Sequence, residues 1–481
     1  MAASHELEPN AATQRAWLDA AARAAFAHLA ALGARPKPGG PPVALPSADR
    51  PRIGEVSLPG GIEAALAVVT GAARDAVPAT SPGFLGYIPG GGLYATALAD
   101  FLADVLNRYT GIARAAPDLV GLENDVLAWL AAQFGYPLRA AGLFTSGGSL
   151  ATFAAVLVAR EAHFATDADL RLAVGYTSAQ AHASIAAAFR LAGLPQANLR
   201  AAPVDPEFRM RLDAVREMVR ADRARGLRPF VVIATAGSTN TGAIDSLAEA
   251  AALCHELRLW LHIDAAYGGA FVLCEEGKRR LAGIELADSI TFDPHKGMFL
   301  PYGTGCLLLR DGLPRNTAAA GDTSYLQDLR TEGGGPSPAA FGLELTRPFR
   351  GLRIWLPLML HGAAAFREAL TEKLDLSAAL HRGLQDLVDK GAPIEILAVP
   401  QLTVIPFRLR RRPDEPLESW NRRNAGFLEA INAKRRSFLS STMLPSAHGE
   451  VLTLRACVLS FRTHARHIQD CLEDVALAAA G

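Results

Sequence analysis

The spacing of hydrophobic and polar residues divides the chain into three regions. Apolar residues recur at helical spacing over 13–32, and the helix expected there ends at the proline- and glycine-rich stretch that follows. Helical spacing returns over 94–134. From residue 142 the period changes, and short apolar runs alternate with helical stretches such as 149–164 and 246–257. These runs occupy 142–146, 170–176, 229–237, 259–266, 289–294 and 305–310.

Strands that alternate with helices predict an α/β fold with a mostly parallel sheet covered on both faces. Beyond 352–366 the pattern indicates helices and a few strands, at 394–399, 402–407 and 451–461, which is typical of a smaller α+β domain. We therefore expect an N-terminal helical segment and linker over 1–80, a large domain over 81–360 and a small C-terminal domain over 361–481.

Composition and charge exclude several classes of protein. The chain has 481 residues, half of them hydrophobic, and its 48 basic residues balance 48 acidic ones. No net field therefore attracts nucleic acid or an anionic membrane. The N-terminus has no signal-peptide pattern, and no apolar run is long enough to span a bilayer. The five cysteines are scattered, without C-x-x-C spacing, which suits a reducing cytoplasm.

Candidate chemistry falls at the ends of the expected strands, where parallel sheets bind ligands. In "LFTSGGSLAT" a glycine pair, Gly147 and Gly148, precedes a helix that opens with Ser149. Free N–H groups at such a helix start favour an anion such as phosphate, and glycine allows close approach. An ordinary turn with Ser149 as helix cap explains the same residues.

Four other side chains have similar alternatives. Asp264 ends an apolar strand, and a buried carboxylate there needs a partner, which an ordinary turn can also supply. His182 lies near a helix start, and Thr235 follows another strand; each can be merely structural. Lys296 stands in "TFDPHKGMFL", where burial is costly unless the amine is paired, neutralised or made covalent.

Taken together, these residues are the parts needed to hold pyridoxal 5'-phosphate. A lysine binds the cofactor covalently, an aspartate pairs with the protonated pyridine nitrogen, and a helix start takes the phosphate. A covalent link also removes most of the cost of burying Lys296.

The chain resembles the group II pyridoxal-phosphate decarboxylases, the family of aromatic-L-amino-acid, glutamate and histidine decarboxylases. Its motifs occur in the family's order over nearly the whole chain, and the pair "HIDAAYGG" and "DPHK" is highly specific. The motifs are "SPGFLGYIPGGG", "LENDVLAWL", "TSGGSLAT", "QAHASI", "ATAGSTNTGAID", "LWLHIDAAYGG", "DPHKG" and "RPFRGLRIW".

The resemblance implies a role for each matching residue. Lys296 is similar to the lysine that holds the cofactor, and Asp264 to the residue bonded to its ring nitrogen. The remaining positions contact the cofactor or the substrate. His182 and Ala266 would pack on the two faces of the ring and Thr235 beside it, and Gly148 and Ser149 would bind the phosphate. His295 would contact the phosphate or the lysine, and Phe84, Tyr87, Ile88 and Pro89 would line the side-chain pocket.

The resemblance also implies the type I fold of pyridoxal enzymes, an obligate homodimer with active sites at the interface, and an amino-acid substrate that loses carbon dioxide to give an amine. The apolar segment 84–92 favours an aromatic or apolar side chain on the substrate. Two alternatives stay open. One keeps the cofactor but ends in oxidative deamination to an aldehyde, or in transamination; the other is a nicotinamide enzyme or an inactive protein.

The chain departs from the family at two places. Asp293 stands where the family often has Asn, near the phosphate, so its carboxylate must turn away, pair with a cation or be protonated. In the family, a tyrosine in a mobile loop often donates the α-proton, but the corresponding segment 327–350 contains neither Tyr nor His. Tyr325 precedes that segment and resembles a different family position.

Overall fold

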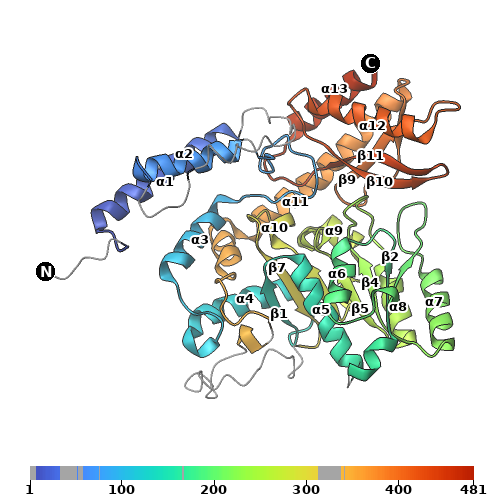
Figure 1. Ribbon diagram of the computed structural model, residues 1–481, viewed down its shortest axis with the longest axis horizontal. Helices are drawn as coiled ribbons and strands as arrows, with labels where there is room; N and C mark the ends of the chain where they lie inside the picture. The colour runs from blue at the N-terminus through green and yellow to red at the C-terminus, as the bar shows by residue number, and fades with distance from the viewer. Residues whose placement is uncertain are drawn as a thin grey trace.

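The computed structural model describes residues 7–32, 51, 58–74, 76–164, 167–312, 337–340 and 342–480. Two β-sheets organise them, as Figure 1 shows: a seven-stranded sheet in the lower part of the view and a four-stranded sheet at the upper right. The large sheet has the order β1-β7-β6-β5-β4-β2-β3. Its strands are β1 (Ala141–Thr145), β2 (Ala173–Ser178), β3 (Leu199–Ala202), β4 (Arg228–Thr235), β5 (Trp260–Asp264), β6 (Ser289–Phe292) and β7 (Gly305–Leu309).

The prediction of an α/β fold with a mostly parallel sheet is confirmed. Strands β2 to β6 pair in parallel, and β7 runs antiparallel to both of its neighbours, β1 and β6. Strands β2, β6 and β7 are buried at every position, as expected for a sheet covered on both faces.

Two helical layers cover the large sheet. Helices α5 (Gly148–His163) and α6 (Ala183–Leu191) pack on one face, against β4 and β7. On the other face lie α4 (Pro117–Gln133), α7 (Leu212–Ala224), α8 (Leu247–Leu257) and the segment from Gly268 to α9 (Glu275–Arg280). Residues at the carboxyl ends of β4 and β5 line a cavity, at the edge where parallel sheets commonly bind ligands.

The small sheet is antiparallel, with the order β10-β11-β9-β8. Its strands are β8 (Ile394–Ile396), β9 (Val404–Leu409), β10 (Ser440–Ser446) and β11 (Gly449–Cys457), and α12 (Leu417–Asn432) and α13 (Ala465–Ala480) pack against it. Helix α11 (Leu352–Asp389) joins the two sheets and kinks at Gly362. The domain limits expected from the sequence stay a prediction; the limit at 360/361 falls inside α11, beside this kink.

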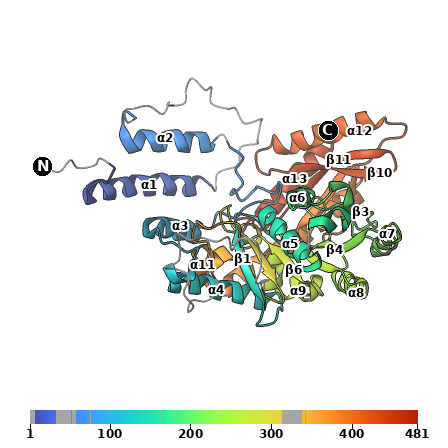
Figure 2. The ribbon, with the colours of Figure 1, turned by 60° about the horizontal axis from the view of Figure 1, so that its bottom comes forward.

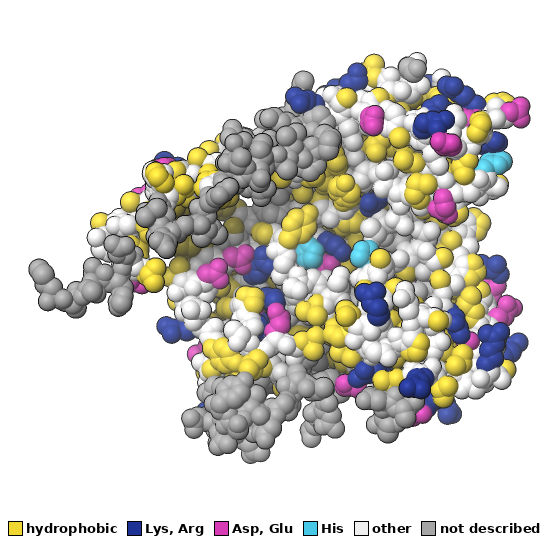
Figure 3. Space-filling model, in the orientation of Figure 1, with side chains coloured by type: hydrophobic (Ala, Val, Ile, Leu, Met, Phe, Trp, Pro, Cys, Tyr) yellow, Lys and Arg dark blue, Asp and Glu magenta, His cyan; other side chains and the backbone are white. Residues whose placement is uncertain are grey.

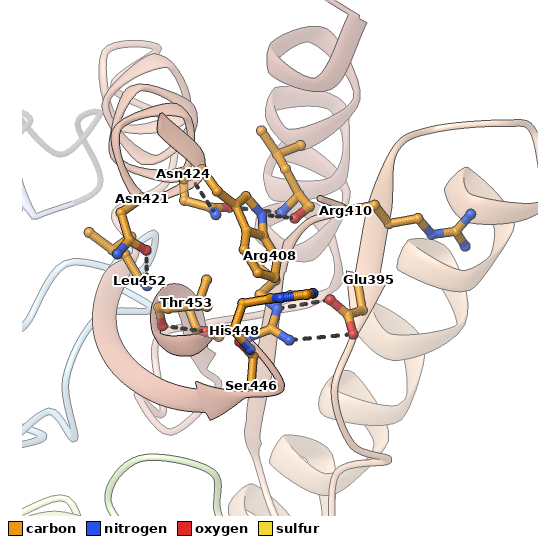
Figure 4. A network of polar contacts seen from close by, with 12 residues as sticks. Glu395, Arg408, Arg410, Asn421, Asn424, Ser446, His448, Leu452 and Thr453 are labelled. Carbon is orange, nitrogen blue, oxygen red and sulfur yellow. Dashed lines mark hydrogen bonds and ion pairs between the residues drawn. The ribbon is translucent and has the colours of Figure 1, made fainter. Parts of the chain in front are cut away.

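A polar network fixes α12 to the small sheet (Figure 4). Arg408 of β9 pairs with Glu395 of β8, with 2.8 Å between Nε and Oε2. The Arg408 guanidinium also lies 4.8 Å from the ring centroid of Trp420, whose Nε1 donates to the Leu409 carbonyl at 2.7 Å. Because charge pairing and ring contact share one buried side chain, the helix has a defined position on the sheet.

The first two helices, α1 (Ala11–Ala31) and α2 (Gly61–Arg74), pack on each other and project from the body next to α3 (Tyr94–Leu106) (Figures 1 and 2). The helix expected over 13–32 is therefore present. Phe26 of α1 approaches Tyr94 of α3, with 6.1 Å between ring centroids. Within the described ranges, no helix is long and apolar enough to cross a membrane.

Candidate active site

The register of the large sheet brings the expected site residues together. Thr235 at the end of β4 lies opposite Asp264 at the end of β5, and Asp264 lies opposite Thr291 of β6. Immediately after β6 the chain enters α10 (Pro294–Gly297), which carries Lys296. Three neighbouring strands thus deliver their polar residues to one edge of the sheet.

A cavity of about 520 Å³ opens at this edge. Eight of the residues expected to hold a cofactor line it: Gly148, Ser149, His182, Thr235, Asp264, Ala266, His295 and Lys296. Figure 3 shows histidine, basic and acidic side chains gathered near the middle of the corresponding face. The structure therefore unites residues that are more than 140 positions apart in the sequence, from Gly148 to Lys296.

Asp293 pairs with the lysine. Its Oδ2 lies 2.9 Å from Lys296 Nζ, the carboxylate is only 2% exposed, and the lysine side chain is 23% exposed. Of the three alternatives that the sequence left for Asp293, pairing with a cation is the one found. Among the described residues nothing bonds to Asp293 Oδ1, which is buried.

His295 is oriented by the loop that follows it. Its Nδ1 lies 2.7 Å from the Thr304 carbonyl, and because a carbonyl only accepts, Nδ1 carries the proton. Its Nε2 then faces Asp293 Oδ2 at 3.8 Å. Burial lowers the pKa of His295, and the Asp293 charge opposes that shift. A neutral imidazole therefore stands beside the Asp293–Lys296 pair.

Asp264 forms the floor of the cavity. It is 7% exposed, and its Oδ1 accepts a hydrogen bond from the Ala266 amide at 3.1 Å. Two residues earlier on the same face of β5, His262 contacts Ser289 Oγ through Nδ1 (2.9 Å) and Thr291 Oγ1 through Nε2 (3.2 Å). Burial lowers the pKa of His262 to about 4, although Asp264 raises it. A neutral histidine with both ring nitrogens bonded therefore lies two residues before Asp264 on β5.

Thr235 is held through its backbone. Its amide donates to Asp245 Oδ2 at 2.7 Å, and Asp245 Oδ1 accepts from the Met210 amide at 2.6 Å. Burial raises the pKa of Asp245 to about 6, against the effect of these two hydrogen bonds. The Thr235 hydroxyl is buried and has no partner within the described residues, so it is available to a ligand.

The start of α5 also lines the cavity. A Cβ on Gly148 would lie 2.7 Å from Asp293 Oδ2 and 3.2 Å from Ala266 Cβ, so only glycine fits this close approach. The first amides of a helix have no helical acceptor, and α5 is 16 residues long, so this end favours an anion.

His182 caps α6, as its place near a helix start indicated. Its Nδ1 accepts from the Ser184 amide at 3.2 Å, and the ring is exposed at the cavity. The alternative of a purely structural cap accounts for Nδ1 but leaves Nε2 without an assignment.

The segment expected to line the side-chain pocket does not line this cavity. Phe84, Tyr87, Ile88 and Pro89 are absent from its lining. Phe84 and Tyr87 lie instead against the small domain: the Phe84 ring stacks on Phe438 with 5.0 Å between ring centroids, and the Tyr87 amide donates to Ser440 Oγ at 2.9 Å. The glycines that follow them contact the chain after Lys296. The Gly91 amide donates to the Leu300 carbonyl at 3.2 Å, and the Gly90 amide to Tyr302 Oη at 3.2 Å. Tyr87 is 54% exposed. Their role in substrate binding stays a prediction. Tyr325 and most of the segment 327–350 lie outside the described residues.

Sequence reasoning missed Arg353, which anchors the lysine loop. It donates from Nη2 to the Tyr302 carbonyl at 3.0 Å and from Nη1 to Thr304 Oγ1, and its Nε lies 2.8 Å from Asp100 of α3. The motif "RPFRGLRIW" contains this residue, but nothing in its letters showed that the arginine would reach the loop around His295 and Lys296.

Comparison with known proteins gives the family. The pyridoxal-dependent decarboxylase conserved domain matches residues 74–410. An aromatic-L-amino-acid decarboxylase of Bacillus atrophaeus is 34% identical over 383 residues, which cover 79% of this chain and 78% of the relative. The enzyme of the same name from Bos taurus is 29% identical over 83% of this chain and 82% of the relative.

Solved structures share the fold. Oryza sativa TDC with PLP and tryptamine superposes with a TM-score of 0.86 at 23% identity, covering 98% of this chain and 99% of that one. Rhodiola rosea 4-hydroxyphenylacetaldehyde synthase gives 0.83 at 22% identity, with 98% of each chain covered. The chain belongs to the pyridoxal-dependent decarboxylase family. It is an amino-acid decarboxylase that uses pyridoxal 5'-phosphate, as its motifs indicated.

The residues present fit this cofactor. The start of α5 suits a phosphate, Asp264 suits a protonated ring nitrogen, and the unpartnered Thr235 hydroxyl lies between neighbouring strand ends. Lys296 Nζ lines the same cavity. Each group of the cofactor therefore has a chemically matched side chain or helix end in the same cavity.

Proposed function

We propose that this protein removes carbon dioxide from an aromatic L-amino acid and releases the corresponding amine. The observation that carries the proposal is the cavity where Lys296, Asp264 and the start of α5 meet. The aromatic class rests on the relatives named aromatic-L-amino-acid decarboxylase and on the apolar segment 84–92, whose Gly91 amide bonds to the Leu300 carbonyl after Lys296.

Each site residue has a proposed task. Lys296 Nζ binds the cofactor covalently, and Asp264 holds a proton on the ring nitrogen because an anion in a dry site stabilises the nearby cation. When bound, the cofactor accepts the electron pair left by the carboxyl group. Six further residues hold the cofactor in place. His182 and Ala266 cover its ring faces, Thr235 Oγ1 donates beside the ring, and the start of α5 with Gly148 and Ser149 takes the phosphate, near His295.

A panel of L-amino acids tests the proposal, with carbon dioxide and amine measured for each. We expect release from at least one of tryptophan, tyrosine, phenylalanine and their hydroxylated forms, and none from glutamate. Release from glutamate alone would contradict the aromatic assignment. D-isomers serve as matched controls because a chiral site should leave them intact.

A second candidate is decarboxylation coupled to oxidation, which gives an aldehyde, ammonia and hydrogen peroxide. It is favoured by the sequence of 327–350, which holds no Tyr or His to protonate the product. Running the same substrate in air and under nitrogen separates the two reactions, since only the oxidative one consumes oxygen.

We also propose that the protein forms a homodimer. Large apolar side chains are exposed along α1 and α3, as expected for surfaces that a second copy covers. They include Trp17, Leu18, Phe26, Phe101, Val105 and Leu106. Light scattering should give twice the 50.8 kDa chain mass, and Val105→Glu should weaken the dimer more than the control Leu172→Glu, an exposed residue outside these helices. A cytoplasmic location is also proposed, since all five cysteines are free and buried.

A further inference from the structure

The proposed decarboxylation needs an acid, because the α-carbon must receive a proton where the carboxyl group was. The family's usual tyrosine is missing from 327–350. The closest pair of opposite charges in the cavity is Asp293 and Lys296, 2.9 Å apart. The roles proposed for binding the cofactor explain neither this ion pair nor the burial of Asp293.

We propose that Asp293 keeps Lys296 protonated after the substrate amine has displaced it, so that Lys296 donates the missing proton. The proton passes from Lys296 Nζ to the α-carbon, whose electron pair forms the new C–H bond. Lys296 is left as a neutral amine. That is the nucleophile needed to release the product amine and bind the cofactor again, so one residue completes both steps. The inference rests on the proposed function.

The surroundings of the pair support this assignment. Asp293 Oδ2 has two neighbouring nitrogens, Lys296 Nζ at 2.9 Å and His295 Nε2 at 3.8 Å, but Nδ1 carries the proton of His295 and burial lowers its pKa. Lys296 is thus the cation that balances the buried carboxylate. Cys457, whose pKa the lysine charge lowers, nevertheless stays a neutral thiol because burial raises its pKa to about 12.

Asn at this position would remove the charge and keep the shape. In Asp293→Asn holoenzyme, the positive charge on Nζ loses its counterion. The visible band of the protonated, lysine-bound cofactor should therefore disappear at a lower pH, with the titration midpoint moved by about one unit or more. Asp288→Asn is the matched control: Asp288 is a partly buried carboxylate at the other end of the same strands, where its Oδ2 accepts from the Leu261 amide at 2.7 Å. That variant should leave the midpoint unchanged.

Product analysis completes the test. With its proton donor weakened, Asp293→Asn should give less amine per carbon dioxide and more aldehyde and peroxide in air, and Asp293→Glu should restore part of the amine yield. An unchanged midpoint would show that Asp293 does not act on Nζ. A shifted midpoint with an unchanged amine yield would show that another acid donates the proton. Either result overturns the proposal.

The two arms also separate this inference from the proposed function. The titration needs no substrate, so it reports on Asp293 and Lys296 even if aromatic amino acids are not decarboxylated. The product arm then uses whichever amino acid releases carbon dioxide from the wild-type enzyme.

Discussion

The strand ends of the large sheet and the segment 84–92 differ in how they are held. Thr235 and Asp264 are buried and fixed by strand pairing and by amide hydrogen bonds to Asp245 and Ala266. Segment 84–92 belongs to no helix or strand and joins two parts of the fold: the Leu85 amide donates to the Phe438 carbonyl just before β10 at 2.9 Å, and the Gly91 amide to the Leu300 carbonyl at 3.2 Å. The sheet therefore fixes the polar groups of the cavity, whereas segment 84–92 bridges the small sheet and the lysine loop. Its proposed contact with the substrate side chain stays a prediction.

The largest effect is expected at the strand ends of the large sheet. Lys296→Ala removes the only atom proposed to bind the cofactor covalently, so decarboxylation should become undetectable while the sheet stays folded. Borohydride treatment followed by mass spectrometry should find cofactor on the peptide that contains residue 296 in wild type and not in the variant. Near-normal turnover in the variant would remove Lys296 from the mechanism.

Asp264→Asn should have the next largest effect. The amide keeps the size of the carboxylate but cannot stabilise a protonated ring nitrogen, so kcat should fall on the order of 10³-fold. Folding should be spared, because the Ala266 amide can still donate to the remaining oxygen. Steady-state kinetics measure the fall in kcat, and circular dichroism checks that the variant stays folded. Activity within a few-fold of wild type would mean that the ring nitrogen lies elsewhere.

A much smaller change is expected at segment 84–92. Tyr302→Phe removes the hydroxyl that accepts from the Gly90 amide at 3.2 Å. One hydrogen bond of this kind contributes about 1 kcal/mol, so KM should rise about fivefold with kcat nearly constant. A fall in kcat instead would show that Tyr302 acts on the chemistry, and would erase the distinction between the two regions.

The difference between strand ends and tertiary contacts explains how much of the fold and site could be predicted from sequence. Residues that follow apolar strands, such as Asp264 and Lys296, were located because strand order and the carboxyl-end rule place them together. Strands β3 and β10 were missed: "LRAA" and "SSTMLPS" lack a clear apolar run, and the second contains a proline. The pairing of Asp293 was left open because a partner's distance depends on tertiary packing. The support from Arg353 and Asp245 was not visible for the same reason.

The smallest effect on turnover at neutral pH is expected for His262→Gln, which alters stability in acid. The folded pKa of His262, about 4, lies below the ordinary value of 6.5. The unfolded chain therefore binds a proton more readily, so this group's contribution to stability is present above pH 6.5 and is lost as pH falls toward 4. Asp245 acts in the opposite sense, because its pKa is raised to about 6 and acid favours its folded form. Between pH 7 and pH 5 the histidine should cost wild type about 2 kcal/mol of unfolding free energy.

Urea unfolding at the two pH values isolates this contribution. Because Asp245 is present in both proteins, its effect cancels when wild type is compared with His262→Gln, and the variant should lose about 2 kcal/mol less between pH 7 and pH 5. Gln can still bond to Ser289 and Thr291, so its stability at pH 7 should stay close to that of wild type. Equal losses in the two proteins would mean that His262 is already protonated in the folded state. Asp264 would then lie two residues from a positively charged His262 on β5, and charge as well as hydrogen bonds would stabilise the strand ends.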